Sequence, residues 1–259
     1  IGCGHMGSAI AKALLSKKLG HVWASKRSEP HIDLPVNSKK FFHWTVDNRE
    51  VVKAVDIIVI AVRPFTVQEV LMEIAPLLKK KQILISIAAG THIWKLKKWS
   101  GGHKKIVRVM PNLPLQILQG MSVWKAAPGL SHKEKKLISK LINTFGISRK
   151  IDNEKLIDYP ISGVTPAYTA AFLESMIRVG RKIGYSEKEA YCIALQGILG
   201  SLLYIKETKP HLKVLIKAVC TKGGVTEAGF KILKKKKWQA TLEKALFAGY
   251  KRAQTINKR

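Results

Sequence analysis

The segment nearest the amino end of the sequence has the spacing of a phosphate-binding turn. Residues 2–7 read Gly-Cys-Gly-His-Met-Gly, which fits G-x-G-x-x-G, and a helical pattern of apolar residues follows. Glycines at these positions permit a tight turn and a close approach of a pyrophosphate, which would bind N–H groups at the helix start. The alternative is a tight glycine turn followed by a solvated basic loop. We expect a dinucleotide to contact Gly2, Gly4, His5, Met6 and Gly7.

A second group of candidate ligand-binding residues follows about twenty residues later, where dinucleotide folds meet the adenosine ribose. Residues 25–28 read Ser-Lys-Arg-Ser and close a possible second strand. An NAD-selective site usually has Asp or Glu there, whereas two cations and two hydroxyls suit a 2′-phosphate. We therefore expect Ser25, Lys26 and Arg27 to bind NADPH in preference to NADH.

A glycine pair near the carboxyl end could bind a carboxylate. Gly223 and Gly224 lack Cβ atoms and can expose backbone N–H groups, while Thr221 and Thr226 carry hydroxyls that donate or accept hydrogen bonds. We expect Thr221, Gly223, Gly224 and Val225 to form a substrate cradle. The Thr226 hydroxyl could bind a ligand at this turn, or it could cap the following helix.

The pattern between these segments predicts the scaffold that positions them. In the first part of the chain, short β-branched runs alternate with amphipathic stretches, as in βαβ units with a parallel sheet. Candidate strands are residues 21–25, 57–62, 83–87 and 106–109. After about residue 154 the runs give way to long stretches with helical periodicity, such as 167–183 and 187–206.

The fold class that we expect is α/β: a Rossmann-like dinucleotide-binding domain at residues 1–153, then an all-helical domain at residues 154–259. Wide apolar faces in the second domain suggest burial against another chain, with internal packing as the alternative. Their apolar residues are Ile193, Leu195, Leu199, Leu202 and Leu203.

Only Ile1 precedes the glycine turn, although a strand normally leads into such a turn. We therefore expect the given sequence to start within a longer chain. If the strand were absent from the molecule itself, the central sheet would lose a strand and cofactor binding would be in doubt. Any targeting peptide would precede the given sequence.

The composition bears on partners and compartment. The formal charge is +29, from 46 Lys plus Arg against 17 Asp plus Glu. The cations are spread along the chain without interleaved aromatic residues, which favours a solvated basic surface over specific nucleic-acid binding.

The longest apolar run, residues 57–62, is too short to span a membrane. Three dispersed cysteines show no metal-ligand spacing and favour a reducing compartment, the cytoplasm. His92, His103 and His211 are expected at the surface.

Five blocks in order resemble the pyrroline-5-carboxylate reductase family across nearly the whole chain. The most specific is residues 218–229, Ala-Val-Cys-Thr-Lys-Gly-Gly-Val-Thr-Glu-Ala-Gly, which is similar to the family's C-terminal signature. The others are residues 61–64 (Ala-Val-Arg-Pro), 86–90 (Ser-Ile-Ala-Ala-Gly), 108–112 (Arg-Val-Met-Pro-Asn) and 162–168 (Ser-Gly-Val-Thr-Pro-Ala-Tyr).

The resemblance implies reduction of 1-pyrroline-5-carboxylate to L-proline, the last step of proline biosynthesis, with NADPH as cofactor and NADH possible. It also implies a homodimer or higher homo-oligomer formed through the helical domain. Thr226 would donate a hydrogen bond to the imine nitrogen, and Glu207 would be a substrate-side acid. The implied cofactor contacts are Asn48, Ala61, Val62, Arg63 and Pro64 at the adenine and ribose side, and Ala88, Ala89 and Asn112 near the nicotinamide. No metal is implied.

One departure from the family pattern leaves alternatives open. Residues 162–165 read Ser-Gly-Val-Thr where Ser-Gly-Ser-Gly is usual, which adds two β-branched side chains. The chain could act on a different imine or oxo acid. It could also be a paralogue that binds NADP(H) without turnover, or a protein that binds polyanions through its basic surface.

Overall fold

The structure, a computed structural model, describes residues 1–28, 32, 34–159 and 161–256. The chain forms two compact units. One comprises Ile1–Gly163 together with the chain from Tyr250 onward, and the other is Val164–Gly249. The domain boundary between residues 153 and 154 stays a prediction.

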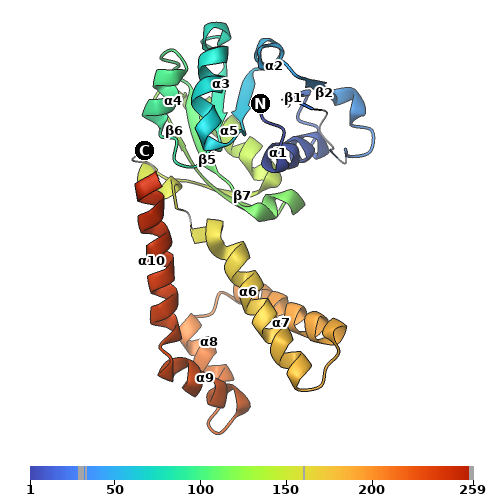
Figure 1. Cartoon of the computed structure of the whole chain (residues 1–259), viewed down its shortest axis with the longest axis vertical. Coiled ribbons are helices and arrows are strands. Elements are labelled where there is room, and N and C mark those ends of the chain that lie inside the picture. Colours follow the sequence, from blue (N-terminus) through green and yellow to red (C-terminus); the bar gives the residue numbers. More distant parts are fainter. Residues whose placement is uncertain (29–31, 33, 160, 257–259) are drawn as a thin grey trace. The chain divides into compact units, whose positions relative to one another are not determined.

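The strands of the N-terminal unit form two sheets (Figure 1). A parallel pair consists of β1 (Val22–Ser25) and β2 (Phe42–Thr45). A five-stranded sheet has the order β3-β4-β5-β6-β7, formed by β3 (Ile57–Ile60), β4 (Ile83–Ser86), β5 (Ile106–Met110), β6 (Gly120–Ala126) and β7 (Gly146–Lys150).

The expected strands are present, with ends shifted by at most two residues. Strands β3, β4 and β5 are parallel as predicted, but β6 runs antiparallel to β5 and parallel to β7. The sequence pattern did not reveal this reversal. The α/β fold class, a Rossmann-like part followed by a helical part, is confirmed.

Alternation along the strands divides the core between the two faces of the sheet. Ile58 and Ile60 of β3 pack in one cluster with residues of α2, α3 and α4, while Ile57 and Val59 pack in the other with residues of α1 and α5. Successive strand residues point to opposite faces, so each face is covered by its own helices. The helices are α1 (His5–Ser16), α2 (Asn48–Ala54), α3 (Val67–Ile74), α4 (Ile93–Trp99) and α5 (His132–Ile142).

The first residues of the chain lie between the two sheets. The Ala61 N–H donates to the Ile1 carbonyl oxygen at 2.8 Å, on the β3 side. The N–H groups of Gly2 and Cys3 both donate to the Ser25 carbonyl oxygen at 3.1 Å, on the β1 side. The first residues thus connect the two sheets at the carboxyl ends of β1 and β3.

A cavity of about 650 Å³ lies between β1 and β3. Its lining extends from Gly2 and Gly7 to Val22 and Ile57, which stand at the amino ends of β1 and β3. Dinucleotides bind outside the carboxyl ends of parallel strands. Most of the cavity therefore lies away from the sheet edge where we expect the cofactor.

The second unit is helical, as predicted. Ser186 caps α7 through a capping box with Glu189. Within the described part of this unit, the buried apolar residues are Ala190 and Ala194, whereas large side chains such as Leu199 and Leu202 are about half exposed. The helices are α6 (Ile161–Lys182), α7 (Glu187–Thr208), α8 (Leu212–Val219), α9 (Val225–Lys235) and α10 (Trp238–Ile256); α6 begins and α10 ends in the first unit.

Across the described ranges, none of the helices combines the length and apolar character needed to cross a membrane.

Candidate cofactor and substrate sites

Packing within the protein explains two glycines of the G-x-G-x-x-G turn. Gly2 has φ +88°, and a Cβ there would lie 2.5 Å from Val62 Cγ1 and 2.8 Å from the Val62 nitrogen. A Cβ on Gly7 would lie 2.4 Å from the Gly2 carbonyl oxygen. Both approaches exclude any side chain. The turn is thereby held against Ala61 and Val62, which the family resemblance implies at the adenine and ribose side of the cofactor.

Packing within the protein does not explain Gly4. It is the N-cap of α1, and a Cβ there would meet no described protein atom within 4 Å. The Ser8 N–H closes the first helical turn by donating to the Gly4 carbonyl oxygen at 2.8 Å. The preceding N–H groups, from His5, Met6 and Gly7, are the ones that a helix leaves for an external acceptor. Open space beside these donors fits a dinucleotide pyrophosphate.

The residues predicted to contact the adenosine ribose lie around the end of β1. The buried Ser25 hydroxyl donates to Asn48 Oδ1 at 2.8 Å, and Asn48 Nδ2 donates to Glu73 Oε2 at 2.8 Å. This chain of hydrogen bonds fixes two predicted residues relative to the glycine turn, because the Ser25 carbonyl accepts from that turn. Lys26 and the exposed Arg27 follow directly. Sequence reasoning missed Glu73, since nothing local marks a residue of α3 as a partner of Asn48.

The segment after β3 carries an exposed cation, Arg63. Arg63 is exposed, and its carbonyl oxygen accepts from the Thr66 N–H at 3.0 Å and from the Thr66 hydroxyl at 2.9 Å. Pro64 opens the short 3₁₀ helix Pro64–Thr66. This turn fixes the backbone of Arg63, while its guanidinium extends from the surface.

The turn after β4 carries the two alanines predicted near the nicotinamide. Ala88 is buried, and its N–H donates to the Ser86 hydroxyl at 3.3 Å. Ala89 is exposed, and its carbonyl accepts from the Thr91 hydroxyl at 3.4 Å. Gly90 completes the turn with φ +71°. Ala89 therefore presents backbone and a small side chain to the outside of the turn.

The Asn112 side chain is engaged within the protein. Its Nδ2 donates to the Ser162 carbonyl at 3.0 Å, and its Oδ1 accepts from the Met121 N–H at 2.7 Å. These contacts fasten the turn after β5 to the start of α6. The assignment of Asn112 to the cofactor stays a prediction.

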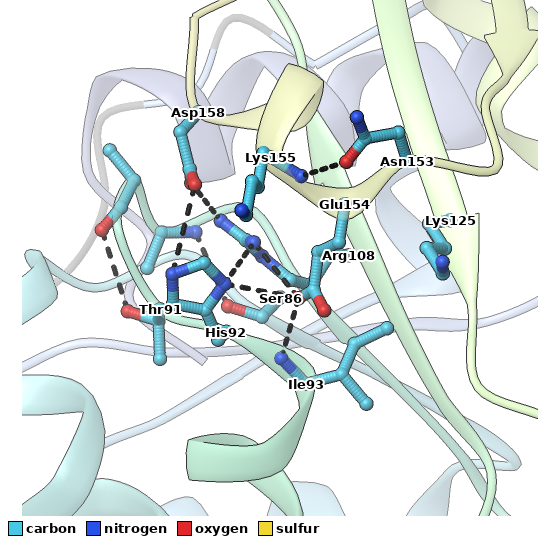
Figure 2. A network of polar contacts seen from close by, with 12 residues as sticks. Ser86, Thr91, His92, Ile93, Arg108, Lys125, Asn153, Glu154, Lys155 and Asp158 are labelled. Carbon is cyan, nitrogen blue, oxygen red and sulfur yellow. Dashed lines mark hydrogen bonds and ion pairs between the residues drawn. The ribbon is translucent and has the colours of Figure 1, made fainter. Parts of the chain in front are cut away.

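A network of charged side chains around the buried Arg108 lies beside the turn after β4 (Figure 2). Arg108, 1% exposed, donates from Nη1 to Glu154 Oε1 at 3.0 Å and from Nη2 to Asp158 Oδ1 at 2.5 Å. The His92 ring lies 3.6 Å from the same Glu154 oxygen and 3.9 Å from Asp158 Oδ2. The expectation that His92 is a surface residue is therefore wrong.

A second histidine is also less exposed than its sequence suggests. His103 is half-buried, with Nε2 2.9 Å from the Gln82 carbonyl oxygen, so its surface assignment is wrong as well. His211 is exposed, as expected.

The predicted substrate cradle forms one turn in the helical unit. The Gly224 N–H donates to the Thr221 carbonyl at 3.0 Å, and Gly223 has φ +74°. A Cβ on Gly224 would lie 2.7 Å from Thr221 Oγ1. Both glycines are thus required by the turn, which leads into α9 at Val225.

Thr226 follows the turn, and its hydroxyl has no hydrogen-bond partner among the residues that the structure describes. The N-cap of α9 is Gly224, without a side-chain cap, so the alternative capping role of Thr226 is contradicted. This hydroxyl is available to a ligand.

Sequence reasoning missed a carboxylate at this turn. Glu227 Oε2 accepts from the Gly223 N–H at 2.9 Å and from Lys231 Nζ at 3.2 Å. The Gly223 N–H, followed by the Lys231 ammonium, lowers the pKa of Glu227. The contact demonstrates that a carboxylate fits this N–H group.

Glu207 lies next to the last residue of α7 and is exposed. It has no ion-pair partner within the described chain. Its role as a substrate-side acid stays a prediction. The described residues contain no group of three or more His, Cys, Asp or Glu that could hold a metal ion.

Comparisons with known proteins agree on one family. The family model for pyrroline-5-carboxylate reductase dimerisation matches residues 156–256, and that for NADP oxidoreductase, coenzyme F420-dependent, matches residues 1–90. A pyrroline-5-carboxylate reductase of Arabidopsis thaliana is 30% identical over 99% of this chain and 94% of its own length. The crystal structure of Plasmodium falciparum pyrroline carboxylate reductase with NADP bound has a TM-score of 0.89 and 31% identity, covering 99% of this chain and 96% of that one.

A second solved structure gives the same result. The pyrroline-5-carboxylate reductase of Coxiella burnetii has a TM-score of 0.87 and 26% identity, covering 100% of this chain and 97% of that one.

Proposed function

Because this chain belongs to the pyrroline-5-carboxylate reductase family, we propose that it reduces the ring C=N bond of 1-pyrroline-5-carboxylate with NADPH, giving L-proline. This is the last step of proline biosynthesis. The observation that carries the proposal is the glycine turn, in which Gly2 and Gly7 are required by packing while Gly4 leaves room beside the helix start. In a second glycine turn of the chain, the Gly223 N–H donates a hydrogen bond to the carboxylate of Glu227.

The N-terminal unit would hold NADPH through named groups. The N–H groups of His5, Met6 and Gly7 would bind the pyrophosphate at the start of α1. Lys26 and Arg27, which follow the buried Ser25, supply the cations that a 2′-phosphate attracts. When bound, NADPH supplies the hydride for reduction. The turn at residues 88–90 would lie beside the nicotinamide.

The helical unit would hold the imino acid. The Gly223 N–H would bind the substrate carboxylate in place of the Glu227 carboxylate that it contacts in the structure, whereas the Gly224 N–H donates to the Thr221 carbonyl and shapes the turn. The Thr226 hydroxyl would donate a hydrogen bond to the ring nitrogen, where electron density and then a proton accumulate as the amine forms. Binding and orientation by these groups would supply most of what the protein contributes to the rate, because no nucleophile is needed.

We propose that the helical unit, taken as residues 154–259, also forms a homodimer or a larger homo-oligomer. Two observations support this proposal: the dimerisation family model matches residues 156–256, and the unit exposes large apolar side chains in the single chain. Contiguous exposed apolar surface usually marks an interface. Sedimentation of the purified protein tests it, since a monomer at micromolar concentration would contradict it.

The cytoplasm is the proposed location. Cys3, Cys192 and Cys220 are free thiols in the structure, with Cys192 exposed. Free exposed thiols persist in a reducing compartment.

The test of the proposed function is the oxidation of NADPH in the presence of 1-pyrroline-5-carboxylate, with proline identified as the product. Substrate-dependent oxidation yielding proline is the expected result. Oxidation with other imines or oxo acids but not with this one would point to an altered substrate. NADPH binding without oxidation of any of them would point to a non-catalytic paralogue.

A further inference from the structure

A fully buried cation holds two carboxylates beside the turn that carries Ala88 and Ala89. Arg108 lies on β5 directly opposite Ser86, the last residue of β4. Its side chain is 1% exposed, and Asp158 is 5% exposed. Burial in a medium of low polarity strengthens the attraction between paired charges and makes the loss of either partner strongly unfavourable. The guanidinium therefore fixes the two carboxylates in one geometry.

One of these carboxylates also holds the start of α4. Glu154 Oε1 accepts from Arg108 Nη1 at 3.0 Å and from the Ile93 N–H at 2.7 Å. Ile93 is the first residue of α4, and His92 is its N-cap. The same oxygen thus fastens β5, α4 and the short 3₁₀ helix Glu154–Ile157 to one another (Figure 2).

The turn at residues 88–90 is held from both of its ends by this arrangement. At its beginning, the Ala88 N–H donates to the hydroxyl of Ser86, the strand partner of Arg108. At its end, Thr91 and His92 lead into the helix start that Glu154 holds. A shift of the Glu154 carboxylate would move the end of the turn, because only Thr91 and His92 separate Gly90 from Ile93.

We propose that Arg108, through Glu154 and Asp158, is a positioning residue that fixes the turn at residues 88–90 and so the place of the nicotinamide. The inference rests on the proposed function, in which Ala88 and Ala89 border the nicotinamide. Hydride transfer depends steeply on the separation and orientation of the reacting atoms, so a small displacement of this turn would slow it. Cofactor affinity depends mainly on the distant pyrophosphate and 2′-phosphate contacts.

The test uses Glu154→Gln in the full chain, which removes the charge while keeping the size of the side chain and an oxygen for the Ile93 N–H. Glu134→Gln is the matched control, because it removes a carboxylate of α5 that pairs with Lys105, the residue before β5. Three quantities are measured: amide hydrogen exchange at residues 88–93 without cofactor, the NADPH dissociation constant, and the single-turnover rate with NADPH and with its deuterated form.

We expect Glu154→Gln to raise amide exchange at residues 88–93 by about tenfold or more, because these groups open more often. The single-turnover rate should fall by about 10- to 100-fold with a larger isotope effect. The NADPH dissociation constant should change by less than about threefold, and Glu134→Gln should leave all three quantities as in the unmodified protein.

Exchange and single-turnover rates equal to those of Glu134→Gln would overturn the inference. A lower melting temperature of Glu154→Gln together with an unchanged single-turnover rate of its folded fraction would also overturn the inference, since that result marks a purely structural role. If Glu154→Gln does not fold, Asp158→Asn provides the same measurements from the other carboxylate. If the unmodified protein does not oxidise NADPH with the imino acid, the proposed function fails, while the exchange measurement still decides whether the network holds the turn.

Discussion

The backbone nitrogen of Ile1 donates a 2.7 Å hydrogen bond to the carbonyl oxygen of Val59 in β3. The Ile1 carbonyl oxygen in turn accepts from the Ala61 N–H at 2.8 Å, just beyond the end of the same strand. Both backbone groups of Ile1 are thus bonded to neighbouring residues of one strand, as in a parallel ladder. These two hydrogen bonds place the glycine turn that follows Ile1 at the carboxyl end of β3.

Arg27→Ala should change cofactor preference. The exposed guanidinium lies next to the end of β1, where a 2′-phosphate would bind. We expect NADPH affinity to fall by about tenfold while NADH affinity stays within about twofold, as measured by fluorescence titration. Arg149→Ala on β7 is the matched control for loss of one surface cation. An unchanged ratio of NADPH to NADH affinity would remove Arg27 from the site.

Thr226→Ala should slow reduction more than it weakens cofactor binding. Its hydroxyl is available to bond the developing amine, and the loss of such a bond raises the barrier by about 1–3 kcal/mol. The measurement is kcat/KM for the imino acid beside the NADPH dissociation constant. Thr241→Ala makes the same change in α10, where the hydroxyl bonds only the Lys237 carbonyl in the described structure. Kinetics equal to those of Thr241→Ala would rule out the assigned role.

Glu227→Gln should improve substrate binding. The Glu227 carboxylate occupies the Gly223 N–H that the substrate carboxylate would need, and its lowered pKa keeps it ionised at assay pH. Removing the charge should lower KM for the imino acid by about two- to fivefold with little change in kcat, because like-charge repulsion is relieved.

The control for this change is Glu189→Gln, which alters the equivalent capping carboxylate of α7. A KM that stays unchanged or rises in Glu227→Gln would show that the substrate carboxylate binds elsewhere.

Much of the fold followed from local spacing. Alternating β-branched runs and helical periodicity predicted the strands of the central sheet and the helices, because buried faces impose those periods on neighbouring residues. The two glycine turns could also be predicted from the sequence, because the local backbone requires positive φ at Gly2 and at Gly223. Ordered motifs then indicated the family.

The tertiary structure alone decided which distant groups meet. Arg108 pairs with Glu154 and Asp158, which lie 46 and 50 residues farther along, and this network makes His92 a half-buried residue. The antiparallel course of β6 likewise depends on how the chain returns to the sheet. Periodicity reports which face of an element is buried, but it does not report the partner. Ion pairs and strand order across the sheet therefore emerge only when the elements pack.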